Sequence, residues 1–220
     1  MRNLLLSTFL LLSVSSFPQT NPKVNLTDYI REIQMWHKDD NNMTLSFWIP
    51  QSYWKIALEN SPQVPKELLE QIESAFENYV FVCALDLQIN MDGTMTYTDE
   101  LSLRKTITIT DVSGKTHQPL QENQLNEDAL TFSRTLKPMF AQMLGQMGAG
   151  MHLYFFEIKD AEKNNLINEY KKSNFSIEHS NKTFKYQLPL VTLLPSKKCP
   201  VDGAEMKGNW MYCPIHGTEL

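Results

Sequence analysis

The sequence predicts an α+β protein: an antiparallel sheet with helices packed on it, followed by a small C-terminal β-hairpin. Short runs of strand-forming residues succeed one another across tight-turn signals, and helical patterns occur in separate blocks, so the regular strand–helix alternation of parallel sheets is absent. The last 22 residues contain the same eight-residue phrase twice. With 42% apolar residues in a chain of 220, there is enough material for one domain core and a small appendage.

The N-terminus is predicted to be a secretory signal peptide, residues 1–16. Arg2 gives a positive start, residues 4–13 are mostly apolar, and residues 14–16 offer small side chains for cleavage. Residues 17–25 then form a flexible leader. The apolar run is shorter than a transmembrane helix needs. We therefore expect a secreted or periplasmic protein without stable membrane insertion after signal removal, with an uncleaved N-terminal anchor as the alternative.

The α+β domain is predicted to span residues 26–195. Its first stretch, residues 29–37, fits a short helix or a strand equally well. Residues 43–49 alternate and are rich in strand formers, which predicts a strand. Two helices follow, at 50–59 and 65–78, and the second opens on Pro65 in its first turn. The apolar face of this second helix is predicted to contain Leu68, Leu69, Ile72 and Phe76.

Hairpin strands make up the middle of the domain. Residues 80–90 and 95–99 are predicted strands joined at Asp92-Gly93, a pair that favours the positive φ of tight hairpin turns. A strand over 103–110 turns at 112–115 toward an edge strand over 117–123. The longest helix spans 127–148 and is expected to kink or divide at Pro138, near Leu136. The remaining strands are predicted at 151–158, 175–179 and 183–188, the last two as a hairpin.

The duplicated phrase starts at Cys199 and again at Cys213, 14 residues later. Each copy reads Cys-Pro, then a potential ligand three residues after the Cys, then Gly. Proline fixes φ and glycine accepts positive φ, so the backbone can curl around a thiolate. Two such turns facing each other would supply the four ligands of a tetrahedral zinc ion. The candidate ligands are Cys199, Asp202, Cys213 and His216.

Between the two turns, Gly208-Asn209 is a turn signal, and Trp210 and Tyr212 alternate as in a short strand. This pattern predicts a hairpin with one ligand-bearing turn at each end, over residues 196–220. These residues would be the zinc-binding part of the chain.

Residues 197–220 resemble the zinc-ribbon family. Cys199 and Cys213 match the first Cys of each ribbon turn, His216 is a ligand type that the family accepts, and Gly203 and Gly217 match its glycines. Asp202 departs from the pattern, where a Cys is usual, and a carboxylate makes the site harder and weaker. The resemblance implies a structural zinc. The chain as a whole resembles uncharacterised secreted bacterial proteins that end in such a ribbon, and this implies no activity.

Two alternatives to the zinc site remain open. A Cys199–Cys213 disulfide could clamp the hairpin in an exported protein, or the turns could fold without any metal. The third cysteine, Cys83, lies in an apolar run and is expected to be a small buried side chain rather than a nucleophile.

The leading functional hypothesis is an exported, non-enzymatic binding or interaction module whose tail either docks on the body or presents Trp210 and Tyr212 to a protein partner. The formal charge of −5 without a basic stripe argues against nucleic-acid binding. One alternative is a periplasmic copper carrier, since thioethers and imidazoles suit Cu(I). Its candidate ligands are Met139, Met143, Met147, Met151 and His152, although methionines at this spacing also fill cores. Another is an enzyme with a cleft in the sheet domain, for which no hydrolase or phosphate-binding motif is present.

Overall fold

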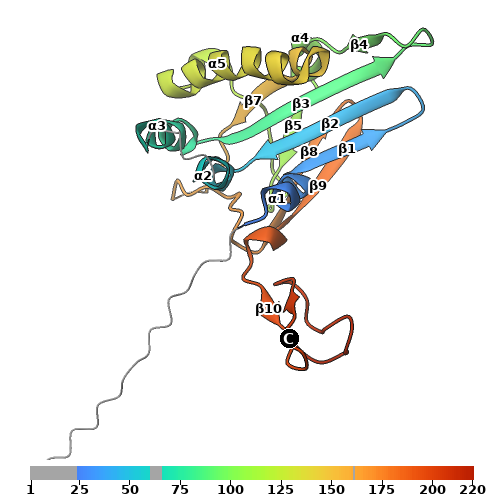
Figure 1. Ribbon diagram of the computed structural model, residues 1–220. Coiled ribbons are helices and arrows are strands. Elements are labelled where there is room, and N and C mark those ends of the chain that lie inside the picture. The colour runs from blue at the N-terminus through green and yellow to red at the C-terminus, as the bar shows by residue number, and fades with distance from the viewer. Residues whose placement is uncertain (1–23, 60–65, 161) are drawn as a thin grey trace, which may run out of the picture.

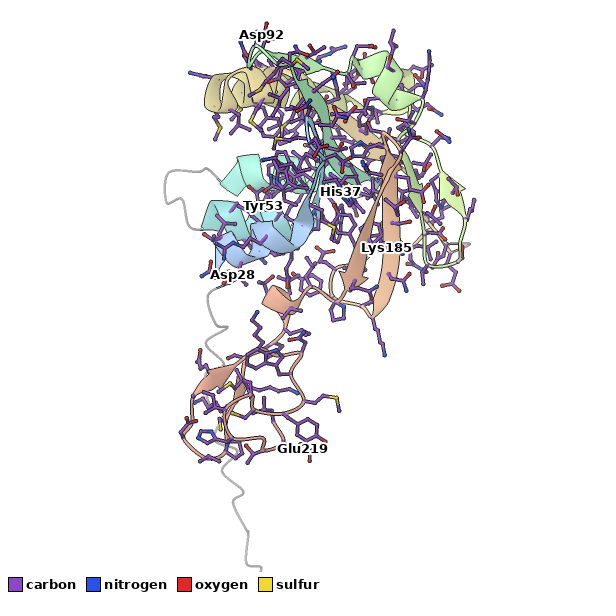
Figure 2. The ribbon with its side chains drawn as sticks, turned by 90° about the vertical axis from the view of Figure 1, so that its right-hand side faces the viewer. Asp28, His37, Tyr53, Asp92, Lys185 and Glu219 are labelled. Carbon is purple, nitrogen blue, oxygen red and sulfur yellow. The ribbon has the colours of Figure 1, made fainter. Side chains whose placement is uncertain are left out.

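The protein is described by a computed structural model that covers residues 24–59, 66–160 and 162–220. It has the predicted α+β fold, but with two antiparallel sheets in the body where the sequence suggested one (Figure 1). Three helices cover one face of the larger sheet, and the smaller sheet covers the other face. A C-terminal segment (residues 196–220) extends beyond these layers; its Glu219 lies well away from the body in Figure 2.

The larger sheet is built around one long central strand, β3. Its strands are β1 Gln34–Lys38, β2 Asn42–Ile49, β3 Val80–Ile89, β4 Met95–Tyr97 and β7 His152–Phe156. β3 pairs with β2 along one edge; along the other edge its first half pairs with β7 and its last residues with β4. All of these pairings are antiparallel, as the hairpin signals predicted.

The smaller sheet has the order β6-β5-β8-β9. Its strands are β5 Thr108–Thr110, β6 Thr116–His117, β8 Ser173–His179 and β9 Lys182–Leu188. The helices are α1 Leu26–Ile33, α2 Gln51–Glu59, α3 Lys66–Phe76, α4 Glu100–Arg104, α5 Glu127–Leu144 and α6 Gln146–Ala149. Two 3-10 turns, η1 Glu122–Gln124 and η2 Val191–Leu193, and the short strands β10 Lys197–Lys198 and β11 Glu205–Met206 complete the fold.

Alternate residues of β3 enter two different cores. Val82 and Ala84 pack toward the smaller sheet, whereas Phe81 and Cys83 pack toward the helices. A strand buried on both faces needs a continuous apolar run, which explains why Val80–Leu85 contains no polar residue. Cys83 is fully buried, as predicted, and burial raises the pKa of its thiol far above the usual range.

Tyr186 of β9 joins the two sheets through its hydroxyl. This buried group donates to the carbonyl oxygen of Ser46 on β2, 3.1 Å away. Its ring stacks on Phe175 and meets Trp48 edge-on, so the polar contact lies inside an aromatic cluster. A hydroxyl paired in this way avoids the free-energy cost of an unpaired buried donor.

Residues 29–37, which fitted a helix or a strand equally well in the sequence, contain parts of both. Asn25 caps α1 by accepting hydrogen bonds from the backbone N–H groups of Thr27 and Asp28, and the helix ends at Ile33. β1 begins at the next residue. Periodicity could not separate the two because each is shorter than the window in which a pattern is visible.

The strand predicted over residues 103–110 is wrong in its first half. Asp99 accepts hydrogen bonds from the backbone and hydroxyl of Ser102, and this N-cap begins the short helix α4. Only Thr108–Thr110 form β5. The following edge strand is likewise only two residues long, because the chain leaves the sheet after His117.

Of the two outcomes predicted at Pro138, a kink or a division of the long helix, the division is wrong. α5 continues through Pro138 to Leu144, and the break comes at Gly145, whose φ of +61° glycine tolerates. Pro138 is exposed, so water can satisfy the carbonyl group that it leaves unpaired. The helix therefore ends where the backbone needs positive φ, and the four-residue α6 follows.

Some sequence predictions lie outside the described residues. These are the signal peptide over 1–16, most of the leader over 17–25, the place of Pro65 in the first turn of the second helix, and the packing of Leu68 and Leu69. Within the described ranges, no helix combines the length and apolarity that a membrane crossing requires.

His179, at the end of β8, makes a testable contribution to stability. It is 1% exposed and stacks on Phe184, and within the described chain neither ring nitrogen has a hydrogen-bond partner of normal geometry. Burial lowers the pKa of His179 to about 4, although the nearby Asp86 carboxylate opposes the shift. In the folded protein this imidazole is therefore neutral at pH values where the unfolded chain already binds a proton.

We predict that the free energy of unfolding falls as the pH is lowered from about 7 to about 5, with His179 alone contributing about 2 kcal/mol. The unfolded imidazole titrates near pH 6.5 and the folded one near 4, so the stabilisation is complete above 6.5 and declines below it. Urea unfolding at both pH values should show a smaller difference for His179→Phe. The exposed His37→Gln is the matched control. If the free energy of unfolding of His179→Phe changes with pH as much as that of the unmodified protein, the prediction is contradicted.

Candidate metal centre

The duplicated phrase folds as two copies of one backbone turn. In the first copy, the amide of Cys199 donates to the carbonyl of Ala204 at 2.9 Å, and the amide of Gly203 donates to the carbonyl of Cys199 at 2.8 Å. The second copy repeats both bonds from Cys213 onward, at 2.7 and 2.8 Å. The sequence repeat is therefore a structural repeat, in which each turn closes around its own cysteine.

The glycine that ends each turn has the backbone conformation that its position predicted. φ is +72° at Gly203 and +66° at Gly217, in the left-handed region that other residues enter at a cost. Each glycine lets the chain reverse direction within five residues of the cysteine. The turn therefore folds the candidate ligand three residues after each Cys back toward the start of its own turn.

Two thiols and one imidazole converge between the two turns. The Nδ1 atom of His216 lies 3.3 Å from the Sγ atom of Cys199 and 3.6 Å from that of Cys213. The ligand atoms of these three residues all lie within 4.8 Å of one another. In a tetrahedral zinc site with ordinary bond lengths, nitrogen and sulfur ligands are separated by about 3.6 Å. This group could therefore bind a metal ion.

The cysteines of this cluster are buried and the histidine is not. Cys199 is 2% exposed and Cys213 1%, whereas a third of the His216 side chain, 30%, reaches solvent. Burial by itself raises the pKa of Cys199, but backbone N–H groups of Val201 and Asp202 outweigh it, helped by the Cys213 and His216 side chains. The net shift is downward and favours the thiolate, the form that binds metals.

Asp202, the fourth predicted ligand, lies beside the cluster and is not one of the three atoms that converge. Its Oδ2 atom is 4.0 Å from Nδ1 of His216, while Oδ1 accepts a hydrogen bond from the amide of Ala204 at 3.0 Å. This Ala204 bond is the main cause of a lowered Asp202 pKa, and the Cys199 thiol lowers that pKa further. The carboxylate is therefore charged and adjacent to the imidazole, but it is turned toward its own turn.

The strand pairing inside the segment differs from the prediction. β10 and β11 flank the first turn and pair with each other, and an isolated bridge joins Tyr212 to Glu219 on either side of the second turn. The predicted hairpin across Gly208-Asn209 does not form, because each phrase already contains the turn that brings its own flanks together. Gly208 instead packs against Leu194 and Pro195, in the linker that joins the body to the segment. An added Cβ at Gly208 would lie 2.6 Å from the Cβ of Leu194.

Cys199, Cys213 and Cys83 are all free thiols in the structure. The disulfide considered as an alternative is thus not formed.

Around the two sulfurs, the apolar contacts of the segment are few: Met206, Ala204, Trp210 and Leu220. Trp210 belongs to this small cluster, so of the two aromatic residues expected to face a partner only Tyr212 is exposed.

The methionines of the copper hypothesis are not on one helix. Met139 and Met143 are exposed on α5, Met147 lies on α6 beyond the break at Gly145, and Met151 is buried under the larger sheet. The Nε2 atom of His152 donates to the carbonyl of Thr98 at 3.0 Å. These five residues therefore form no continuous stripe.

One polar pair was missed by the sequence reasoning. Nε2 of His117 lies 2.7 Å from the buried carboxylate of Asp111, which also accepts from the backbone and hydroxyl of Ser113. These hydrogen bonds close the β5–β6 hairpin. The hairpin register could have revealed the pair, since both residues flank the turn that was predicted at 112–115.

Comparison of the chain with protein-family models, with curated proteins and with solved structures gives no match.

The glycines of the two turns give a first prediction about the cluster. Gly217→Ala should lower the metal affinity of the protein, because alanine resists the positive φ that holds His216 near Cys213. We expect a strain of about 1 kcal/mol and a fivefold or greater loss of affinity in a competition titration with a chromogenic chelator. Gly114→Ala is the matched control, since it introduces the same strain in the β5–β6 turn. Equal losses in both variants would show that strain in the cluster turn has no specific effect.

Proposed function

We propose that residues 196–220 form a zinc-ribbon-like module with a structural Zn²⁺ held by Cys199, Cys213 and His216, with Asp202 as the fourth ligand. The rest of the protein is an exported α+β domain that carries this module as a binding or interaction element. The observation that carries the proposal is the approach of two thiols to one imidazole nitrogen at 3.3 and 3.6 Å.

The donor types favour zinc over other common ions. Two thiolates and an imidazole are ligands of zinc and of copper, whereas calcium and magnesium prefer oxygen. The N···S distances suit tetrahedral coordination, and this is the geometry of structural zinc. Asp202 can complete the tetrahedron if its side chain rotates Oδ2 toward the cluster, from its place 4.0 Å from Nδ1.

A structural role is supported by the size of the segment's own core. Apart from the cysteines, Met206 is its only buried apolar side chain, and the others in contact are partly exposed. Such a core cannot hold a segment of this size, which is why small modules use metals or disulfides. Zinc binding contributes about 10–16 kcal/mol to the folding of small finger peptides. With four protein ligands, no position is left open for a substrate.

The interaction role is supported by apolar side chains that the segment exposes. Val201 and Ile215 occupy the same position of the two phrases, and Met211 and Tyr212 lie between the turns; all four are more than half exposed. Exposed apolar groups gathered on so small a unit favour association with another protein. Export is inferred from residues 1–16, which have the composition of a secretory signal.

Metal analysis of the purified protein tests the site directly. Protein prepared without added metal should contain about one zinc per chain, and Cys199→Ser, Cys213→Ser and His216→Ala should each lose most of it. Asp202→Asn should retain zinc with lower affinity, because an amide oxygen is a poorer ligand than a carboxylate. Cys83→Ala is the control, since it removes a thiol in the body core. If Cys199→Ser keeps its metal, the assignment is refuted.

Metal removal should affect the segment and leave the body folded. After chelation, we expect amide hydrogen exchange over residues 197–220 to accelerate at least tenfold, because the segment loses its main stabilising contact. The amides of β3 should be unaffected, since both faces of that strand are covered independently of the segment. Unchanged exchange at 197–220 after complete chelation would contradict a structural role.

A further inference from the structure

A groove of about 1180 Å³ runs between α5 and the edge of the larger sheet. Its apolar lining includes Leu153 and Phe155 of β7, and Leu130, Pro138 and Ala141 of α5. It is somewhat larger than the roughly 300–1,000 Å³ typical of small-molecule pockets, so a small organic molecule has room in it. The groove is far along the chain from Cys199 and Cys213 and uses none of the residues of the proposed zinc module.

Two positive charges in the groove are not balanced by neighbouring carboxylates. Arg134 and Lys137 lie one turn apart on α5, both exposed and both lining the groove. Neither has an ion-pair partner within 4.0 Å in the part of the chain that the structure describes. The protein as a whole has a formal charge of −5, so two unpaired cations side by side on a groove wall are a local exception.

Two of the other charged groups of the groove are already paired with each other. Arg104 on the opposite wall pairs with Glu100 at 2.6 Å and donates to the carbonyl of Leu120 at 2.9 Å. Glu122 is the second carboxylate in the lining. An anion entering the groove would therefore meet Arg134 and Lys137 as its open partners.

His152 lies in the same lining and is nine-tenths buried. Its Nε2–H donates to Thr98, so the tautomer is fixed, and within the described residues Nδ1 has no hydrogen-bond partner. Burial lowers the pKa of His152, with Lys137 adding to the shift and Glu100 and Asp99 opposing it. The imidazole is thus neutral near pH 7, and the positive charge of the groove comes from α5.

We propose that this groove binds a small monocarboxylate with a single apolar chain. The apolar lining removes the chain from water, and the carboxylate lies against Arg134 and Lys137 at the α5 wall. A long polyanion is a poor match, because two cations on a negatively charged protein give no continuous positive track. A neutral apolar molecule would use the lining but would leave both cations without a partner.

Isothermal titration of the purified protein with octanoate, octanol and propionate separates these contributions. Octanoate should bind with the highest affinity, because only it has both the apolar chain and the anionic head. Raising the ionic strength from low salt to about 0.5 M should weaken octanoate binding and leave octanol binding unchanged. If octanoate does not bind, or if octanol binds as tightly, the proposal is overturned.

Variants then place the ligand. The double variant Arg134→Gln/Lys137→Gln should weaken octanoate about tenfold and hardly change octanol. Ala141→Phe should weaken both by filling the groove. The matched control is Lys115→Gln/Lys185→Gln, which removes one cation from the β5–β6 turn and one from β9. Figure 2 shows Lys185 away from α5. Equal losses in the two double variants would mean that net charge alone governs binding, and this would refute the site.

Discussion

The fold depends on the burial of β3 on both of its faces. Within residues 80–84 of this strand, alternate side chains pack under α2, α3 and α5, and the intervening side chains pack against the smaller sheet. The strand also pairs on both edges, with β2 on one side and with β7 and β4 on the other. Its backbone and side chains are thus satisfied in every direction, so the three layers of the body cannot form without it.

The C-terminal segment is held together by different forces from the body. The body buries large aromatic side chains such as Trp48, Tyr154 and Phe81, whereas the segment has a few apolar contacts around two sulfur atoms. The two are joined through η2, whose first backbone amides and Thr192 hydroxyl are bound by the carboxylate of Glu32 on α1. This anchor fixes the linker next to the body and leaves the turns of the segment to stabilise themselves. A metal ion between the sulfurs would supply the stabilisation that hydrophobic burial does not give this segment.

Local signals in the sequence were sufficient to predict most of the turns and strands. The Asp92-Gly93 turn forms as predicted, and Ser180 and Asn181 take positive φ at the β8–β9 hairpin. The errors occur where several weak signals compete. At residues 100–107 the Asp99 cap overrides a strand-like composition, and at Pro138 an exposed position makes the break unnecessary. The second sheet was not foreseen, because strand order depends on which apolar faces meet in space.

The sequence by itself determined the two turns around Cys199 and Cys213, because proline, glycine and five-residue spacing dictate their backbone. Only the tertiary structure decided which side chains meet. Asp202 and His216 hold the same position in their turns, yet the longer imidazole reaches both sulfurs while the short carboxylate bonds the amide of Ala204. The difference is one of side-chain reach across the gap between two turns, and a repeat in the sequence does not specify that gap.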